Sequence, residues 1–242
     1  MKVLFLGTGE AFDPTLPNNS AVVISKEANI MVDCGYNIPQ QYFNLIGDPE
    51  FIDGLYLTHL HADHCFGVPA LLVWMLEEGR KKPLHLLGPK ARLAEMMTLV
   101  DRGYPGASAK LTFQLLPVEL DESKVVRHCG LDIRIAQTVH GAPNHAVRFD
   151  SGDGKSVMLS GDGEVTEASA KLFEQCSLVA HEAYRVTEHT RGHSSVREVL
   201  DTARKTSVGT VALVHTCRGE KGLLKTLDGP FIVPAPGSIV QV

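Results

Sequence analysis

The strongest functional signal in this sequence is the run Thr58-His59-Leu60-His61-Ala62-Asp63-His64, which follows a short apolar stretch. His59 and His61 are two residues apart, so their side chains project to the same side of an extended chain. Asp63 and His64 follow at the point where we expect the chain to turn into a helix. Neutral imidazoles and a carboxylate are ligands that suit Zn²⁺, Mn²⁺ or Fe²⁺. The run therefore predicts a metal centre in which Asp63 and His64 reach a second ion.

Three further residues of ligand type each follow a predicted strand: His140, Asp162 and His215. Asp162 lies in the turn sequence Ser160-Gly161-Asp162-Gly163. Binding sites commonly form where strands end, and a centre for two ions needs more ligands than the first run supplies. We therefore expect these three residues to complete the metal centre.

The composition is that of a globular protein. The chain has 242 residues, of which 44% are hydrophobic and 21% charged. No run approaches the roughly 20 apolar residues of a membrane span, and the first apolar run is too short for a signal peptide. Five scattered cysteines without a C-x-x-C pair favour reduced thiols and a cytoplasmic location. Cys65 and Cys217 lie near the predicted ligands in sequence and are alternative ligands.

Runs typical of strands and helices alternate in both halves of the chain. Strands are predicted at residues 2–6, 21–25, 30–33, 54–58, 111–116, 131–140, 145–149, 156–159, 178–181 and 210–215. Helices are predicted at residues 66–80, 91–100, 165–175 and 194–205. This order indicates an α+β fold with two sheets packed face to face and helices outside. With no repeat and no linker, residues 1–242 are expected to form one domain.

Taken together, these features resemble the metallo-β-lactamase superfamily over nearly the whole chain. The resemblance is carried by the H-x-H-x-D-H run, by the later ligands and by Asp33 in Val32-Asp33-Cys34-Gly35. It implies a four-layer αβ/βα sandwich of two mixed sheets, with helices on both outer faces and the metals at one edge. It also implies three ligand groups: His59, His61 and His140 on one ion, Asp63, His64 and His215 on the other, and Asp162 bridging both. Asp33 would orient the loop that carries the ligands.

Two later motifs are similar to signature loops of the ribonuclease Z branch. Residues 181–184 read His-Glu-Ala-Tyr where that branch has H-E-A-T, and residues 192–195 read Gly-His-Ser-Ser where it has H-S-T. The resemblance implies that His193 is a general acid facing the phosphate, that Glu182 orients it, and that Asp63 also serves catalysis. The helix amides after His193 are expected to favour a phosphate. A plain helix cap at His193 and a solvated Glu182 are the alternative interpretation.

The sequence departs from the ribonuclease Z pattern in two places. Leu16 and Asn18 stand where the N-terminal loop of that family has basic residues. The segment between His140 and Asp162 has room only for two strands and a turn, so the arm that grips tRNA is absent. We therefore expect a small or different phosphodiester, such as a cyclic nucleotide or cyclic phosphate, as an alternative to RNA.

The charge pattern gives weaker guidance. A net charge of −5 weighs against a general nucleic-acid scaffold, although bound cations would offset part of it. The basic group Arg80-Lys81-Lys82, with Lys90 and Arg92, is either an RNA-binding surface or a solvated face. The remaining histidines, for which we predict surface or packing positions, are His85, His128, His145 and His189.

The predicted function is hydrolysis of a phosphodiester, either at an RNA 3′ end or in a small or cyclic phosphate. Two divalent ions are expected, with zinc preferred and manganese or iron as alternatives. Two other functions stay open: a metal-dependent hydrolase of an ester, thioester or lactone, and a non-catalytic, metal-stabilised RNA-binding module. No membrane partner is expected, and a homodimer is predicted by analogy with related families.

Overall fold

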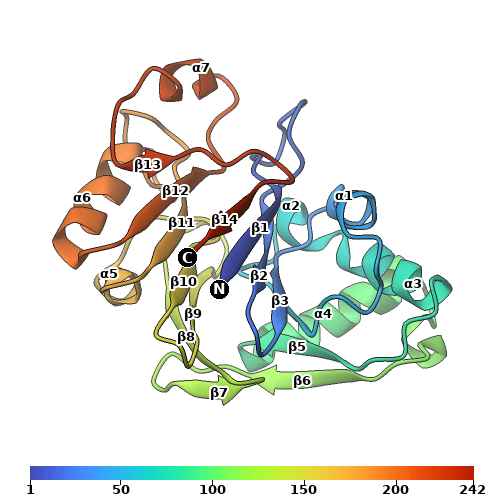
Figure 1. Ribbon diagram of the computed structural model, residues 1–242. Helices are drawn as coiled ribbons and strands as arrows, with labels where there is room; N and C mark the ends of the chain where they lie inside the picture. The colour runs from blue at the N-terminus through green and yellow to red at the C-terminus, as the bar shows by residue number, and fades with distance from the viewer.

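Two seven-stranded sheets pack face to face in the computed structural model, which describes residues 1–242 (Figure 1). The first sheet has the order β14-β1-β2-β3-β4-β5-β6, and the second has the order β13-β12-β11-β10-β9-β8-β7. The first-sheet strands are β1 Lys2–Gly7, β2 Ser20–Ile24, β3 Asn29–Val32, β4 Gly54–Tyr56, β5 Leu84–Gly88, β6 Leu115–Glu119 and β14 Ile239–Gln241. The second-sheet strands are β7 Val126–His128, β8 Leu131–Gln137, β9 His145–Asp150, β10 Ser156–Leu159, β11 Leu178–Glu182, β12 Thr210–Val214 and β13 Phe231–Ile232.

Helices cover the outer faces of both sheets (Figure 1). The helices of the first half are α1 Ile38–Leu45, α2 Ala62–Cys65, α3 Val68–Glu77 and α4 Lys90–Gly103, with the 3₁₀ turn η1 Ser108–Lys110. The helices of the second half are α5 Glu167–Phe173, α6 Val196–Thr206 and α7 Lys221–Leu224. Parallel and antiparallel pairs occur in both sheets. The predicted α+β sandwich of two mixed sheets is therefore confirmed. None of the helices has the length and apolar character needed to span a membrane.

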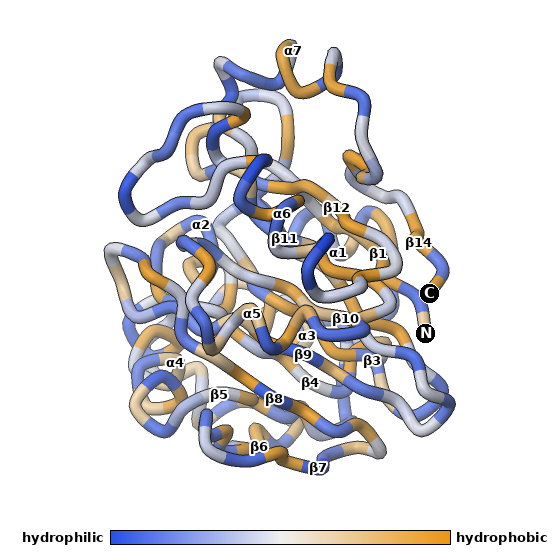
Figure 2. The backbone as a smooth tube through the Cα atoms, turned by 90° about the vertical axis from the view of Figure 1, so that its left-hand side faces the viewer, coloured by the Kyte–Doolittle hydropathy of each residue, from blue (hydrophilic) through white to orange (hydrophobic).

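Side-chain alternation in β1 shows how the layers are held together. Val3 and Phe5 point into the core between the two sheets, whereas Leu4 and Leu6 pack under the helices of the first half. A third apolar cluster joins the second sheet to α5 and α6. Figure 2 shows the matching pattern, with hydrophobic stretches along the strands in the middle of the molecule. Burial on both faces is what a sheet enclosed between two layers requires.

The structure corrects two of the predicted elements and adds several that were not predicted. The strand predicted at residues 111–116 is β6, Leu115–Glu119, and it contains Pro117. A proline lacks the N–H of a ladder, but β6 is the last strand of its sheet and tolerates it. The helix predicted at residues 66–80 is α3, Val68–Glu77, and the short helix α2 ends just before it. At Gly67, between the two helices, a Cβ atom would come within 2.1 Å of the Gly35 carbonyl oxygen. Helix α1 and the strands β5, β7, β13 and β14 were not predicted, because most are short and lack a clear period.

Strand direction gathers the candidate ligands at one edge. Strands β10, β11 and β12 are parallel, and β8 runs in the same direction because β9 is antiparallel to both β8 and β10. The carboxyl ends of these strands therefore meet at the same edge of the second sheet. The loop after β4 of the first sheet lies against this edge, since the backbone N–H of His145 donates to the Thr58 carbonyl over 3.0 Å.

Candidate metal centre and catalytic pair

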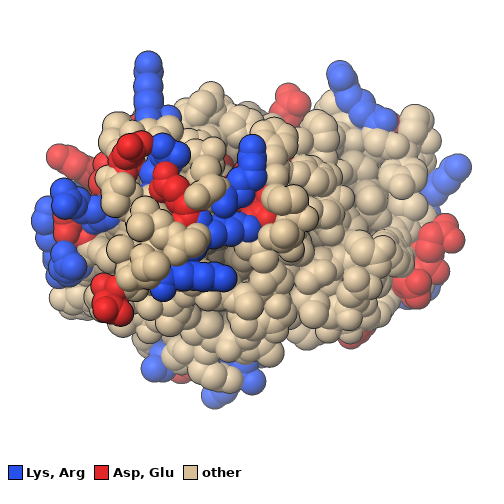
Figure 3. All heavy atoms as spheres, turned by 90° about the horizontal axis from the view of Figure 1, so that it is seen from above, with Lys and Arg blue, Asp and Glu red and all other residues tan.

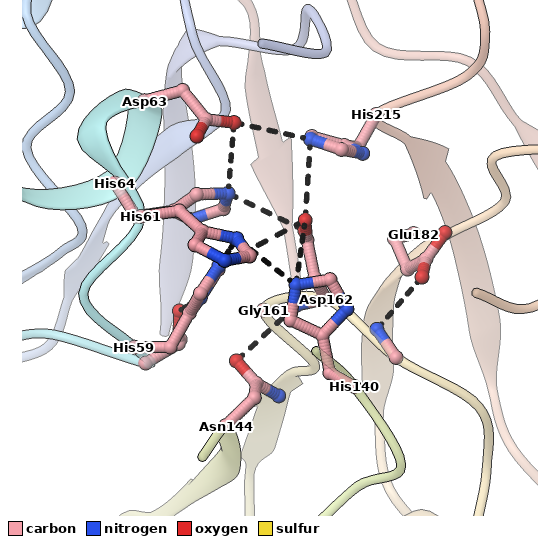
Figure 4. A network of polar contacts seen from close by, with 12 residues as sticks. His59, His61, Asp63, His64, His140, Asn144, Gly161, Asp162, Glu182 and His215 are labelled. Atoms are coloured by element: carbon pink, nitrogen blue, oxygen red, sulfur yellow. Dashed lines mark hydrogen bonds and ion pairs between the residues drawn. The ribbon is translucent and has the colours of Figure 1, made fainter. Parts of the chain in front are cut away.

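The H-x-H-x-D-H run occupies the loop after β4 and the short helix α2. His61 has an extended backbone and precedes α2, which carries Asp63 and His64. His59, Asp63 and His64 are buried. Figure 4 shows the side chains of this run directed toward Asp162 and His215 from the second sheet. The structure thus brings together ligand-type residues that are up to 156 positions apart in the chain.

The first cluster consists of His59, His61, His140 and Asp162. Nδ1 of His61 lies 3.0 Å from Nε2 of His59 and 3.1 Å from Nε2 of His140. Oδ2 of Asp162 lies 3.9 Å from Nε2 of His59 and 3.8 Å from Nε2 of His140. Ligands bound tetrahedrally at 2.0–2.1 Å from zinc are about 3.4 Å apart. The donor atoms therefore stand at nearly the spacing that one ion requires.

The second cluster consists of Asp63, His64, Asp162 and His215, all of them buried. Nε2 of His64 lies 3.3 Å from Oδ2 of Asp63 and 3.3 Å from Oδ1 of Asp162. Nε2 of His215 lies 3.4 Å and 3.5 Å from Oδ2 of Asp63 and of Asp162. Oδ1 of Asp162 and Nε2 of His64 are buried and have no hydrogen-bond partner. Because such atoms are costly to leave unsatisfied, they fit ligands of a cation.

Asp162 belongs to both clusters, so a single carboxylate connects them. Gly161 precedes it with φ +62°, and a Cβ atom there would come within 2.3 Å of Oδ1 of Asn144. The same Oδ1 accepts a 3.3 Å hydrogen bond from the Asp162 amide, while Nδ2 of Asn144 donates to the Ser160 carbonyl over 2.9 Å. Asn144 therefore holds the turn that presents Asp162. The sequence offered no signal for this role, because an asparagine after Pro143 is an ordinary turn residue.

Hydrogen bonds at Nδ1 orient three of the ligand imidazoles. The Nδ1 atom of His64 lies 2.7 Å from Oδ2 of Asp33, that of His140 lies 2.8 Å from the Gly192 carbonyl, and that of His59 lies 3.1 Å from Oγ1 of Thr58. When Nδ1 donates, the lone pair of Nε2 faces the cluster. Carboxylate or carbonyl partners of this kind orient metal-bound histidines and raise their basicity.

Asp33 makes contacts beyond His64. Its backbone is left-handed, with φ 63°, and its carboxylate accepts hydrogen bonds from the amide and hydroxyl of Thr58 at 2.7 Å and 2.8 Å. His215 is also left-handed, with φ 53°. A left-handed backbone is unfavourable for residues other than glycine, and such conformations concentrate at functional sites.

In the second cluster, the histidines and carboxylates shift one another's pKa values. Burial opposes the charged form of His215, but Asp162 and a hydrogen bond to Asp63 outweigh it and raise the pKa of His215 to about 9. Burial also opposes ionisation of Asp63, yet hydrogen bonds from His215 and His64 lower the pKa of that carboxyl. The carboxylates are therefore charged and attract cations, with protons on the histidines when no ion is bound.

Glu182 and His193 form a pair beside the clusters. Glu182 is completely buried, and its Oε1 lies 3.0 Å from Nδ1 of His193. The same carboxylate accepts from the amides of Gly163 at 2.7 Å and Tyr184 at 2.9 Å. The ring of His193 is stacked on Tyr184, with centroids 4.5 Å apart, and its centroid lies 5.0 Å from that of His140. The solvated position of Glu182, one of the alternatives, is therefore excluded.

The backbone amides after His193 do not offer the predicted phosphate site. The Ser194 amide donates to Glu182 over 3.3 Å, and the Ser195 amide donates to Glu198 over 2.7 Å. Ser195 is the cap of α6 and forms a capping box with Glu198, so these N–H groups already have partners. The prediction that they bind phosphate is wrong, because the helix begins two residues later than expected.

Neither alternative for the basic group, an RNA-binding surface or a solvated face, holds for its two arginines. Arg80 is fully buried and donates to the carbonyls of Ile52 and Pro83 at 3.0 Å and 2.9 Å. Arg92 is buried as well and donates to the Leu57 carbonyl over 2.9 Å. Both guanidinium groups satisfy backbone carbonyls that strands and loops leave unpaired.

The structure also places the two cysteines that were alternative ligands and the four remaining histidines. Neither Cys65 nor Cys217 belongs to either ligand cluster. His145 is half-buried between Arg92 and Glu122, at 2.9 Å and 3.2 Å, which is a packing position. His189 is exposed beside Glu198. His85 and His128 lie together, away from these clusters.

A family model described as "Anti-Pycsar protein Apyc1" matches residues 1–220. The chain belongs to this Apyc1 family. This chain is also similar to the ribonuclease Z of Thermococcus kodakarensis, with 26% identity over 89% of this chain and 83% of the length of that relative. The ribonuclease Z of Geobacillus kaustophilus is 24% identical over 97% of this chain and 95% of its own. The predicted resemblance to the ribonuclease Z branch is thereby confirmed.

Two solved structures share the fold of this Apyc1-family chain. The short form of human tRNase Z superposes with a TM-score of 0.83 at 20% identity, covering 100% of this chain and 99% of its own. The Zn²⁺-bound PqqB of Methylobacterium extorquens superposes with a TM-score of 0.77 at 14% identity, over all of both chains. With the His and Asp clusters, these likenesses indicate a divalent-metal site at the sheet edge.

Proposed function

We propose that this chain is a phosphodiesterase that uses two divalent ions, with zinc as the preferred metal. The observation that carries the proposal is the carboxylate of Asp162, which belongs to two adjacent clusters of ligand atoms. His59, His61 and His140 would hold one ion, and Asp63, His64 and His215 would hold the other. When bound, such ions lower the pKa of water and stabilise negative charge on a phosphoryl group.

His193 supplies the proton for the departing oxygen in this proposal. Burial opposes the charged imidazole, but the hydrogen bond and charge of Glu182 outweigh it and raise the pKa of His193 above its ordinary value. A larger fraction of this histidine is then protonated near neutral pH, which is the state a general acid needs. The bond from Nδ1 to Glu182 directs the opposite ring nitrogen away from the carboxylate. His193 therefore acts on the substrate, and Glu182 acts through His193.

The proposed substrate is a small or cyclic phosphodiester in preference to RNA. Strands β9 and β10 form the whole segment between His140 and Asp162 apart from short turns, so no arm extends from this region. On the face shown in Figure 3, basic and acidic side chains are interspersed and large areas are uncharged. Basic side chains also pair with acidic ones, as Arg218 does with Glu10 and Arg185 with Glu220. An RNA backbone is normally bound by a continuous basic surface.

A substrate panel on one preparation tests the proposal. The protein is stripped of metal, reloaded with Zn²⁺ or Mn²⁺, and offered bis(p-nitrophenyl) phosphate, cyclic mononucleotides, a precursor tRNA, a thioester and a lactone. Metal-dependent hydrolysis of the cyclic mononucleotides, at a kcat/KM well above that for the tRNA, is the expected result. Preferential cleavage of the thioester or lactone would overturn the phosphodiesterase assignment. Tight RNA binding without turnover under either metal would instead indicate the non-catalytic module.

A further inference from the structure

A third group of ligand-type side chains lies at the opposite end of the sandwich. It consists of His85 on β5 of the first sheet, with His128 and Cys129 at the β7–β8 turn of the second sheet, and their ligand atoms lie within 4.8 Å of one another. His85 pairs with Gly54 at the start of β4. His59 follows Gly54 by five positions along the β4 segment, which places the group about 16 Å from the catalytic clusters. This group is therefore separate from the site described above.

Both histidines face the space between the sheets. His85 alternates with Leu86 and shares a face with Leu87, which is part of the core between the sheets. His128 shares a face with Val126, which packs against the same core. Their ring centroids are 4.4 Å apart, with the rings nearly perpendicular. Nδ1 of His85 and Nε2 of His128 are buried from solvent and have no hydrogen-bond partner. Native proteins rarely leave such atoms unpaired, and a bound ion satisfies them as well as a hydrogen bond does.

Cys129 occupies a position that its residue type disfavours. It is the first residue of a two-residue hairpin turn, where the pairing of His128 with Leu131 leaves only Cys129 and Gly130 in the loop. Its φ is +47° and that of Gly130 is +76°, as in a type I′ turn, which favours Asn, Asp or Gly. A Cβ atom on Gly130 would come within 2.6 Å of the Glu27 side chain, so the turn is seated against the first sheet. A cysteine at this strained position indicates a role for its sulfur.

We propose that His85, His128 and Cys129 bind one transition-metal ion of the zinc class and that this ion links the two sheets. Two imidazoles and a thiolate are a ligand set of such ions, with a water as the fourth ligand. In a tetrahedral site the nitrogen and sulfur ligands are about 3.4–3.6 Å apart. The ligand atoms of this group lie within 4.8 Å of one another, so rotamer changes of the half-exposed side chains bring them to that spacing when the ion binds. The ion replaces the proton of the Cys129 thiol, which is released to solvent.

Cobalt spectroscopy of the full-length protein tests this site without depending on activity. Metal-free protein is titrated with Co²⁺ under a phosphine reductant, and the thiolate-to-cobalt charge-transfer absorption in the near ultraviolet is recorded. The catalytic clusters contain only histidine and aspartate, so they do not produce this absorption. We expect the band in the wild-type protein and its loss in the Cys129→Asn variant. Absence of the band from the wild type, or its persistence in Cys129→Asn, would refute the site.

The choice of variants separates metal loss from misfolding. Asparagine is favoured at the first position of a type I′ turn, so Cys129→Asn is expected to fold at least as well as the wild type without metal. Its zinc content should fall by about one ion per chain while phosphodiester hydrolysis stays within about twofold. Cys217→Ser, which removes another half-buried thiol, should retain the band. Loss of the band in Cys217→Ser alone would assign it to the other cysteine and overturn the proposal. His128→Asn should behave like Cys129→Asn.

Discussion

The Nδ1 atom of His193 lies 3.0 Å from Oε1 of Glu182, and the carboxylate of Glu182 is completely buried. The two residues come from different elements, since Glu182 ends β11 and His193 precedes α6. Two backbone amides, those of Gly163 and Tyr184, also bind the carboxylate and fix it in place. The position of His193 beside the metal clusters is therefore determined by a rigid acceptor, although the histidine lies in a loop.

Replacing His193 tests its role as the acid. His193→Ala should reduce kcat by about 10²–10⁴, the usual contribution of a general acid. The metal content should stay at the wild-type level, because His193 belongs to neither of the clusters that share Asp162. Turnover and metal analysis on the same sample check both points. A variant that loses metal along with activity would show a structural role instead.

The pH profile of Glu182→Gln tests the pair directly. Glu182 raises the pKa of His193, so the acid form is present below that raised pKa and is lost as the pH increases through it. Removing the negative charge lowers the pKa, and the alkaline limb of the kcat profile should move to lower pH. The amide keeps an acceptor oxygen for the backbone, which limits structural damage. An unchanged alkaline limb would assign that limb to another group.

Asp162→Asn should remove metal binding from both clusters at once. The carboxylate contributes oxygen atoms to the two groups, and an amide lacks the charge that holds a cation between neighbouring histidines. Metal analysis after dialysis is expected to show neither ion retained at the catalytic clusters. As a matched control, Asp150→Asn alters an aspartate that pairs with Arg148 at 2.8 Å on β9, and it should retain full metal content. Full metal retention in Asp162→Asn would contradict the bridging role.

Asp33→Asn should weaken metal binding without abolishing it. Asp33 contacts His64 over 2.7 Å and orients its ring, and losses of such partners typically cost 10–100-fold in metal affinity. Competition with a chelator measures the change. Asparagine tolerates the left-handed backbone at this position, so the fold should be preserved. An affinity equal to that of the wild type would show that the hydrogen bond has no effect on the metal.

Metal uptake should release protons near pH 7.5. Without an ion, Asp162 and Asp63 raise the pKa of His215 to about 9, and the charges of Asp162 and Asp33 raise that of His64. Because the ligand must be the neutral imidazole, binding at the two catalytic clusters should expel about two protons, in addition to the proton of Cys129, and affinity should fall as the pH is lowered. Calorimetry in buffers of different ionisation enthalpy measures the number. Uptake without proton release would contradict ligation by these histidines.

The sequence alone predicted the features that depend on residues close together in the chain. The i, i+2 spacing of His59 and His61 fixes their common direction through backbone geometry alone. The strand pattern likewise predicted most of the two sheets. It placed β6 too early and ended it before Pro117, because a proline is typical of a strand end, and only the position of β6 at the sheet edge makes the proline acceptable.

Tertiary structure decided every relationship between distant residues. The residue types of Asp162, Glu182 and His193 pointed to chemistry, but their distances depend on strand direction and on the left-handed turns around them. The same reason explains the basic group: Arg80 and Arg92 look like surface charges in sequence, yet both bind buried carbonyls. It also explains His85, His128 and Cys129, which come from two sheets and meet only because those sheets pack face to face. The sequence by itself determined which chemical groups are present, and the packing of the sheets determined which of them meet.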